Sequence, residues 1–323
     1  MWHSRLNLLR YLFICRINSP FVFFQHHPSV ELSLALGQLI AERLPTAQAR
    51  PWHKTLAEWK TEGGNTLAQR KKKSRQQPEN PWPLEAALLS YPTKRNLSEG
   101  EYVFWELKLI GASAEHGLFL ETILPAFEQL GYAADSRWRY PNCFWGHFDI
   151  HAVYMARGRH WEPLVEAGRL HLDYPAGPRQ WAEGLVFEAD LKQPCDYLTW
   201  VTPYEPEQKT RSEPPPSLKS ILDALVGRMN RLLSGKHLRQ DALNDFLDEP
   251  DRTALKEALE LAAHIPVLSH DLDQPFQTGP GRWIGRQTFS TAIPEIIRPL
   301  LGIASIFHIG RYTHYGCGTF AIN

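Results

Sequence analysis

A segment near the end of the chain has residue types that suit contact with phosphates. Its glycines, Gly310, Gly316 and Gly318, lie among a cation and aromatic rings. Glycine lets backbone N–H groups approach a phosphate because no Cβ stands between them. Three side chains of this segment can pair with a phosphate or contact a base, namely Arg311, Tyr312 and His314. The alternative interpretation is a tight turn after a helix.

Two further groups of cations could bind a phosphate backbone. One run holds five cations in six residues, namely Arg70, Lys71, Lys72, Lys73 and Arg75. The other group, Arg228 and Arg231, lies on the polar face of a predicted helix over 218–233. Clustered Lys and Arg neutralise phosphates. A solvated loop and a solvated helix face are the alternatives.

Bulk composition argues against a uniformly basic protein. Lys plus Arg equals Asp plus Glu, 35 each, so the formal net charge is zero. Local basic grooves remain compatible with this balance, because phosphate affinity depends on where the cations lie. The length of 323 residues fits two domains better than one.

Motifs for metals and common cofactors are missing from the sequence. The four cysteines include no CxxC pair, which argues against a zinc ribbon, and their sparse use fits a reducing cytoplasm. The chain has no Rossmann fingerprint, P-loop or HExxH. We expect no cofactor and no metal. The apolar stretch over 9–24 is too short and too interrupted for a membrane span, so we expect a cytoplasmic protein without a membrane partner.

The first half of the chain predicts a β-α-β-β-α-β order. Its expected elements are strands at 9–17, 84–91, 102–110 and 148–154, with helices from about Ser29 to Pro45 and over 116–130. Ser29 is a plausible N-cap, and Pro125 should kink the second helix or shift its start. Residues 46–82 are polar, and we expect them to form a basic loop insertion.

The same order recurs in the second half. Its expected strands cover 185–191, 196–201, 266–272, 282–290 and 319–322. Leu218 to Leu233 keep helical spacing, a second helical stretch covers 251–263, and Thr291 should cap a last helix with Pro294 early in it. The fold class is therefore predicted as α+β, with two tandem ferredoxin-like (RRM-like) domains over 1–157 and 158–323. The second domain would end in the glycine-rich loop.

Several segments carry a family resemblance. They are WIGRQTF at 283–289, PLLG at 299–302, FHIGRYTHYGCGTF at 307–320, EYVFWELKLIGA at 101–112, LTWVTP at 198–203 and the stretch 81–92. Together they resemble the CRISPR-associated endoribonucleases of the RAMP superfamily that process precursor crRNA, the sixth Cas family. The resemblance covers most of residues 81–323. The family patterns are missing at 25–32 and 136–145.

The resemblance implies an activity. Enzymes of this kind bind CRISPR repeat RNA and cleave precursor crRNA without a metal, leaving a 2′,3′-cyclic phosphate and a 5′-OH. The reaction needs a base, an acid and a cation that stabilises the phosphorane. Many relatives place a histidine near the first helix, where this chain has His26 and His27, with His53 and Lys54 as a second candidate pair. The alternatives are a polar loop before Pro28 for His26 and His27, and a surface position for His53.

The resemblance leaves two functions open. The chain would either cleave repeat RNA or hold crRNA in a CRISPR effector complex without cutting it. Its expected partners are CRISPR repeat RNA or crRNA and other Cas effector subunits. The RNA-binding residues would be the three cationic and glycine-rich groups already named.

Overall fold

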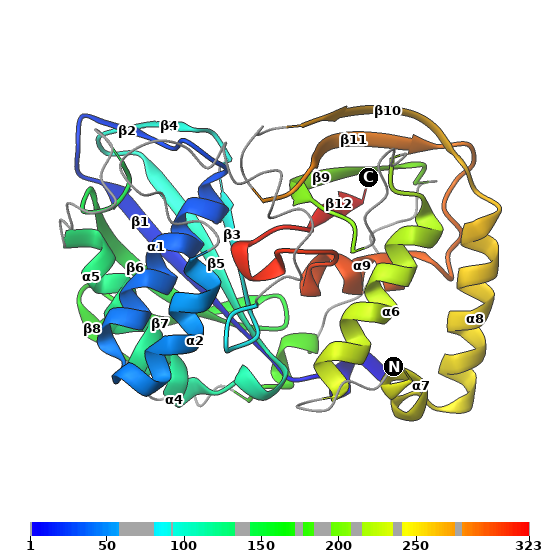
Figure 1. Cartoon of the computed structure of the whole chain (residues 1–323), viewed down its shortest axis with the longest axis horizontal. Helices are drawn as coiled ribbons and strands as arrows, with labels where there is room; N and C mark the ends of the chain where they lie inside the picture. Colours follow the sequence, from blue (N-terminus) through cyan, green and yellow to red (C-terminus); the bar gives the residue numbers. More distant parts are fainter. Residues whose placement is uncertain are drawn as a thin grey trace.

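The computed structural model describes residues 2–57, 81–91, 93–132, 143–171, 177–183, 195–207, 215–234, 241–274 and 280–322. These residues form two units side by side, each built on its own antiparallel sheet (Figure 1). Among the described residues, no helix is long and apolar enough to cross a membrane.

The first sheet is organised around a central strand, β1, whose side chains alternate between buried and more exposed from Leu9 to Ile17. In the described part of the chain its strand order is β3-β5-β1-β6-β7-β8, and every pair is antiparallel. The strands are β1 (Leu8–Ile17), β3 (Ala86–Tyr91), β5 (Tyr102–Ile110), β6 (Phe148–Arg157), β7 (His160–Glu166) and β8 (Arg169–Leu170). Tyr11, Phe13 and Cys15 are fully buried on one face of β1, because successive strand residues point to opposite faces. A small separate sheet pairs β2 (Phe21–Phe23) with β4 (Asn96–Ser98).

Helices cover the buried face of this sheet (Figure 1). They are α1 (Pro28–Arg43), α2 (Thr46–Leu56), α4 (His116–Leu118) and α5 (Leu124–Tyr132), with a π-helical turn, η4 (Phe119–Ile123), between the last two. The η4 turn directly precedes Pro125, which stands at the second residue of α5. The helical segment still begins at His116, so its start is not shifted, and the irregularity ahead of Pro125 is this π-helical turn.

The second sheet repeats the strand arrangement of the first. Among the described residues its order is β10-β11-β9-β12, again antiparallel throughout. Its strands are β9 (Tyr197–Tyr204), β10 (Val267–Asp273), β11 (Trp283–Phe289) and β12 (Phe320–Ile322). The helices are α6 (Leu218–Ser234), α7 (Ala242–Phe246), α8 (Glu249–Ala263) and α9 (Arg298–Phe307). Figure 1 shows α8 outside α6, away from the first unit.

Both units have the topology predicted from the sequence. In chain order, β1, β3, β5 and β6 occupy the same sheet positions as β9, β10, β11 and β12. This is the ferredoxin-like order, with α7 and α8 inserted before β10 in the second unit. The α+β class with tandem ferredoxin-like folds is confirmed. The boundary at 157/158 stays a prediction, and the first sheet continues past it through β7 and β8.

Three local expectations were wrong. Residues 46–56 form helix α2 instead of a loop, because Ala49, Trp52 and Leu56 keep helical spacing and pack inward. The N-cap of α1 is His27, whose Nδ1 accepts from the Ser29 backbone N–H, and Ser29 lies inside the helix.

The third wrong expectation concerns the last helix. Helix α9 starts at Arg298 instead of near Thr291. Pro299 fits the first helical turn, where its missing N–H is not needed. The predicted strand at 185–191 lies outside the described residues.

Each unit contributes side chains to the core of the other. Tyr312, Tyr315 and Cys317, which follow α9, belong to the first apolar core. In return, Trp2 and Leu6 from the N-terminal end belong to the second core. The N-terminus accordingly lies beneath the second unit before β1 enters the first (Figure 1). The two units therefore fold as interlocked bodies.

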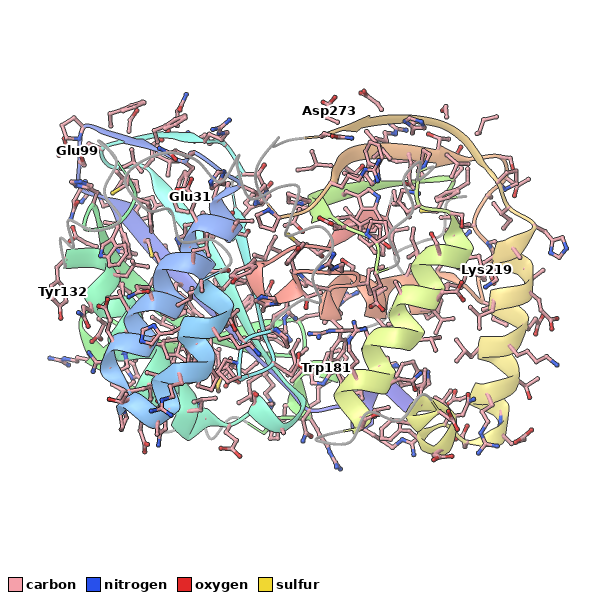
Figure 2. All side chains as sticks on the ribbon, viewed as in Figure 1. Glu31, Glu99, Tyr132, Trp181, Lys219 and Asp273 are labelled. Atoms are coloured by element: carbon pink, nitrogen blue, oxygen red, sulfur yellow. The ribbon has the colours of Figure 1, made fainter. Side chains whose placement is uncertain are left out.

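A further link is the buried Trp181, in the 3₁₀ helix η6 (Gln180–Ala182). Its indole Nε1 donates to the Leu6 carbonyl at 2.9 Å, and its ring packs edge-on against Phe307 at 5.4 Å. Figure 2 shows Trp181 where the two units meet.

We predict that Trp181→Ala lowers the free energy of unfolding by about 3–5 kcal/mol, because it removes a large buried ring and leaves a cavity. Urea unfolding monitored by circular dichroism measures this change. The control is Tyr132→Ala, since Tyr132 is 74% exposed and its loss should cost less than about 0.5 kcal/mol. Equal losses in the two variants would contradict the interlocked arrangement.

Candidate functional site

The glycine loop, residues 308–318, lies inside the molecule. Every residue of this loop is buried. Gly310, Gly316 and Gly318 have φ values of +82°, +78° and +88°, the left-handed region that favours glycine. A Cβ on Gly318 would lie 1.9 Å from the Ile309 carbonyl oxygen, so the loop folds back on itself too tightly for any side chain.

The loop connects the second unit to the first. A Cβ on Gly316 would lie 2.1 Å from the Leu88 carbonyl oxygen of β3 and 2.8 Å from the Ser29 Cβ of α1. On the other side, the Arg311 N–H donates to the Glu205 carbonyl at 2.8 Å, and the Arg311 guanidinium lies over the Tyr312 ring. The predicted RNA contacts of Arg311, Tyr312 and His314 remain predictions, and in this structure all three side chains contact protein.

A buried polar cluster lies where the loop meets β5. His308 Nδ1 is 3.1 Å from the Cys317 carbonyl, and His308 Nε2 is 3.2 Å from Lys108 Nζ. A carbonyl can only accept, so Nδ1 carries the proton, and Nε2 accepts from the lysine. Burial, and next the Lys108 charge, hold the pKa of His308 well below its ordinary value. Burial lowers the pKa of Lys108 to about 8, although Glu106 opposes this change.

The two arginines predicted on α6 differ in their surroundings. Arg228 is 4% exposed and pairs with Glu85 of the first unit, with 2.8 Å between Nη1 and Oε2. Arg231 is partly exposed and pairs with Glu207 at 2.6 Å. Arg228 therefore joins the two units. Contact of either arginine with RNA stays a prediction.

His26 and His27 lie at the start of α1 and are poorly accessible. Burial, together with the charge of Arg95, lowers the pKa of His26 to about 4. Burial lowers the pKa of His27 to about 4 as well, although the Val201 backbone opposes this change. His27 also caps α1. The structure thus gives His27 a structural role in the helix and leaves little of either ring open to a substrate.

His53 and Lys54 lie in the last turn of α2 and are exposed. Arg50 is exposed on the same helix, at i−3 from His53 and i−4 from Lys54, so the three side chains share one face. Helix α2 has no acidic residue. Among the described residues, this is where a predicted histidine and a predicted cation stand together at the surface. The run 70–75 follows in the chain but lies outside the described residues.

Several residues that position these groups were not predicted from the sequence. Trp52, Trp82, Glu85 and Lys108 each anchor a contact of α2 or a contact between the units. The cationic Lys108 within the apolar strand 102–110 was the available signal, since a buried charge in a strand implies a partner. Nothing local in the sequence indicates that this partner is His308, which is 200 residues away.

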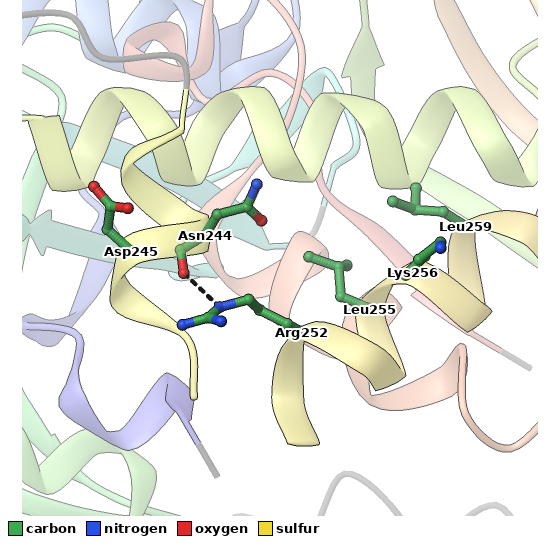
Figure 3. Close-up of a pocket in the computed structure, with 6 residues that line it drawn as sticks. All are labelled: Asn244, Asp245, Arg252, Leu255, Lys256 and Leu259. Carbon is green, nitrogen blue, oxygen red and sulfur yellow. Dashed lines mark hydrogen bonds between the residues drawn. The ribbon is translucent and has the colours of Figure 1, made fainter. Parts of the chain in front are cut away.

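A pocket elsewhere on the molecule contains none of the predicted residues. It has a volume of about 570 Å³ and is lined by Asn244, Asp245, Arg252, Leu255, Lys256 and Leu259 of α7 and α8 (Figure 3). Its Arg252 is already engaged, donating to the Asn244 and Leu247 carbonyls. In the described ranges, no group of three or more His, Cys, Asp or Glu residues could hold a metal ion.

Comparison with known proteins shows what the second unit resembles. The model of the CRISPR-associated endoribonuclease Cas6 matches residues 198–320. The resemblance to the Cas6 family is confirmed. The match begins in β9 and ends at the first residue of β12, so it contains β10, β11, most of β9 and the glycine loop. No curated protein sequence matches the chain.

Solved structures that contain Cas6 align with nearly all of the chain. A partial Cas6-RT-Cas1–Cas2 complex aligns with 98% of this chain and 46% of its own, at 12% identity and a TM-score of 0.50. A Cas6 product complex aligns with 98% of this chain and 99% of its own, at 15% identity and a TM-score of 0.47. Cas6 of Thermus thermophilus covers the same shares at 16% identity and a TM-score of 0.44. Identities this low bear on the fold alone.

Lowering the pH should reduce the free energy of unfolding, because the buried His27 ring takes up a proton less readily than in the unfolded chain. Its folded pKa of about 4 lies below the ordinary 6.5, so the unfolded chain binds the extra proton. This contribution to stability is fully present above pH 6.5, falls as the pH drops, and is lost by about pH 4. It amounts to roughly 3 kcal/mol at most.

We predict that His27→Asn, which keeps a capping acceptor but cannot titrate, loses less stability than the wild type between pH 7 and pH 4.5. Urea unfolding at the two pH values measures the difference. If both proteins lose stability equally, the buried ring is not a source of the acid sensitivity.

The ion pair between the units gives a further prediction. Arg228→Ala should lower the free energy of unfolding by about 2–4 kcal/mol, because it removes a buried side chain and breaks its pair with Glu85. Arg231→Ala, a matched change one turn along α6 at a partly exposed pair, should cost less than about 1 kcal/mol. Chemical unfolding of both variants measures the two losses. A larger loss for Arg231→Ala would contradict the assignment of Arg228 to the contact between the units.

Proposed function

We propose that this chain is a Cas6-like endoribonuclease that binds CRISPR repeat RNA and cleaves precursor crRNA without a metal. The observation that carries the proposal is the exposed pair His53 and Lys54 on α2, in a chain whose second unit matches the Cas6 family. The other candidate histidines near the first helix have restricted access and lowered pKa values. Of the three candidate histidines near the first helix, His53 is therefore the one whose ring an RNA strand can reach.

In the proposed reaction, His53 removes the proton from a 2′-OH, and the 2′-oxygen then attacks the adjacent phosphorus. The bond from phosphorus to the 5′-oxygen breaks, and that oxygen takes up a proton from Lys54 or from water. The products are a 2′,3′-cyclic phosphate and a 5′-OH. Lys54, with Arg50 on the same face, stabilises the negative charge that builds up on the phosphate oxygens.

The proposed partners are repeat RNA, or crRNA as product, and other Cas proteins. The Cas6 match of the second unit supports RNA as the ligand. One of the solved structures that share this fold is a partial Cas6-RT-Cas1–Cas2 complex. This supports Cas subunits as the class of protein partner.

The test uses the full chain, labelled CRISPR repeat RNA and EDTA. We expect cleavage that leaves a cyclic phosphate end. His53→Ala should slow single-turnover cleavage by about 10²–10⁴-fold, as for loss of a general acid–base group. Lys54→Ala should slow it by about 10–10²-fold, with Lys54→Arg partly restoring the rate. Both variants should bind the RNA with a Kd within about threefold of the wild type.

The matched control is His160→Ala, an exposed histidine on β7 outside the proposed site, which should leave the rate unchanged. Cleavage that EDTA abolishes would overturn the metal-independent mechanism. Tight binding of RNA that stays intact would instead identify the chain as a crRNA-binding subunit that does not cut. If His53→Ala cleaves RNA at the wild-type rate, His53 is not part of the catalytic site.

A further inference from the structure

The last turn of α2 is held in place from its buried side. Thr55 Oγ1 donates to the Pro81 carbonyl at 2.9 Å, and the Trp52 ring packs on Trp82 with 5.0 Å between centroids. Leu56 lies fully buried in the first core. A helix turn moves as one piece. The contacts that hold Trp52 and Thr55 therefore also set the orientation of the exposed His53 and Lys54.

Part of that support comes from the second unit. Tyr315 of the glycine loop is fully buried and lies in the first core. Its hydroxyl donates to the Thr55 carbonyl at 3.4 Å, and its ring meets Trp82 edge-on at 6.2 Å. Tyr315, Trp82 and Trp52 thus form a continuous aromatic row. This row runs from the Cas6-like unit to the residue that precedes His53.

The backbone beside Tyr315 fixes where the ring can lie. Gly316 is in the left-handed region, and a Cβ there would meet the Leu88 carbonyl oxygen and the Ser29 Cβ. Both contacts belong to the first unit. The loop can therefore dock only with glycine at this position, since any side chain would push Tyr315 away from α2.

We propose that Tyr315 and Gly316 are positioning residues that hold the last turn of α2, and with it His53 and Lys54, in the orientation that cleavage requires. The link to cleavage rests on the function proposed above. The glycine loop acts from inside the protein, by orienting residues of the other unit. It does not need to contact RNA to influence the reaction.

The first test separates the rate of cleavage from RNA binding. Tyr315→Ala should lower the single-turnover rate at saturating repeat RNA by about tenfold or more, while the Kd stays within about threefold, because a misplaced catalytic group slows the chemical step. Tyr315→Phe keeps the ring and removes only the long hydrogen bond, so its rate should lie within about threefold of the wild type. A Kd that rises with an unchanged rate would overturn the proposal and assign the loop to RNA contact.

Glycine substitutions provide a matched pair. Gly316→Ala and Gly168→Ala both place a side chain at positive φ, +78° and +72°, but a Cβ on Gly168 meets nothing within 4 Å. We expect Gly316→Ala to behave like Tyr315→Ala and Gly168→Ala to behave like the wild type. Equal effects of the two substitutions would mean that backbone strain alone is responsible, which overturns the proposal.

Hydrogen exchange tests the positioning without any catalysis. In Tyr315→Ala, amides of residues 46–57 should exchange faster than in the wild type, with no such change in Gly168→Ala. Unchanged exchange in α2 would overturn the proposal even if cleavage is observed. If the wild type does not cleave RNA, the proposed function fails, and faster exchange in Tyr315→Ala would still support the mechanical link. Should Tyr315→Ala fail to fold, Tyr315→Leu and Gly316→Ala provide the same measurements.

Discussion

The burial of apolar side chains across the two units is the constraint on which the rest of the structure depends. Tyr312 and Tyr315 complete the first core, while Trp2 and Leu6 complete the second. Burial of this kind is favourable in proportion to the apolar area removed from water. Because each core lacks part of its content without the other unit, the relative orientation of the two sheets is part of the fold. The candidate site on α2 is therefore held in a fixed position relative to the second unit.

Buried charged side chains between the two units add specificity to the apolar contacts. Arg228 and Lys108 are both buried there, and each has a specific partner, Glu85 and His308. A buried charge without a partner costs several kcal/mol, so these pairs discriminate against other packings of the two units. Arg228, one of the cations predicted to bind RNA, is thus paired with a carboxylate inside the protein.

The sequence was sufficient for the fold but only partly for the site. The branched and aromatic residues of 9–17 and the helical spacing from Leu218 are local signals, and both ferredoxin-like units followed from such patterns. Local signals also identified His53 with Lys54 as a candidate pair. Burial of the glycine loop was not predictable in this way, because it depends on contacts such as Gly316 with Leu88. Helix α2 was missed because only four of its residues are buried, Ala49, Trp52, Thr55 and Leu56, and the rest of the segment is polar or exposed.

The insertion of Tyr312, Tyr315 and Cys317 into the first core bears on how the protein is made. A ribosome releases the first unit long before these three residues are synthesised. Until then the first sheet and its helices lack the side chains that fill the space beside Trp82 and Leu88. The first unit therefore stays incompletely packed until residues 312–317 have been synthesised. Synthesis of the second unit becomes the step that completes the first, so both units mature together.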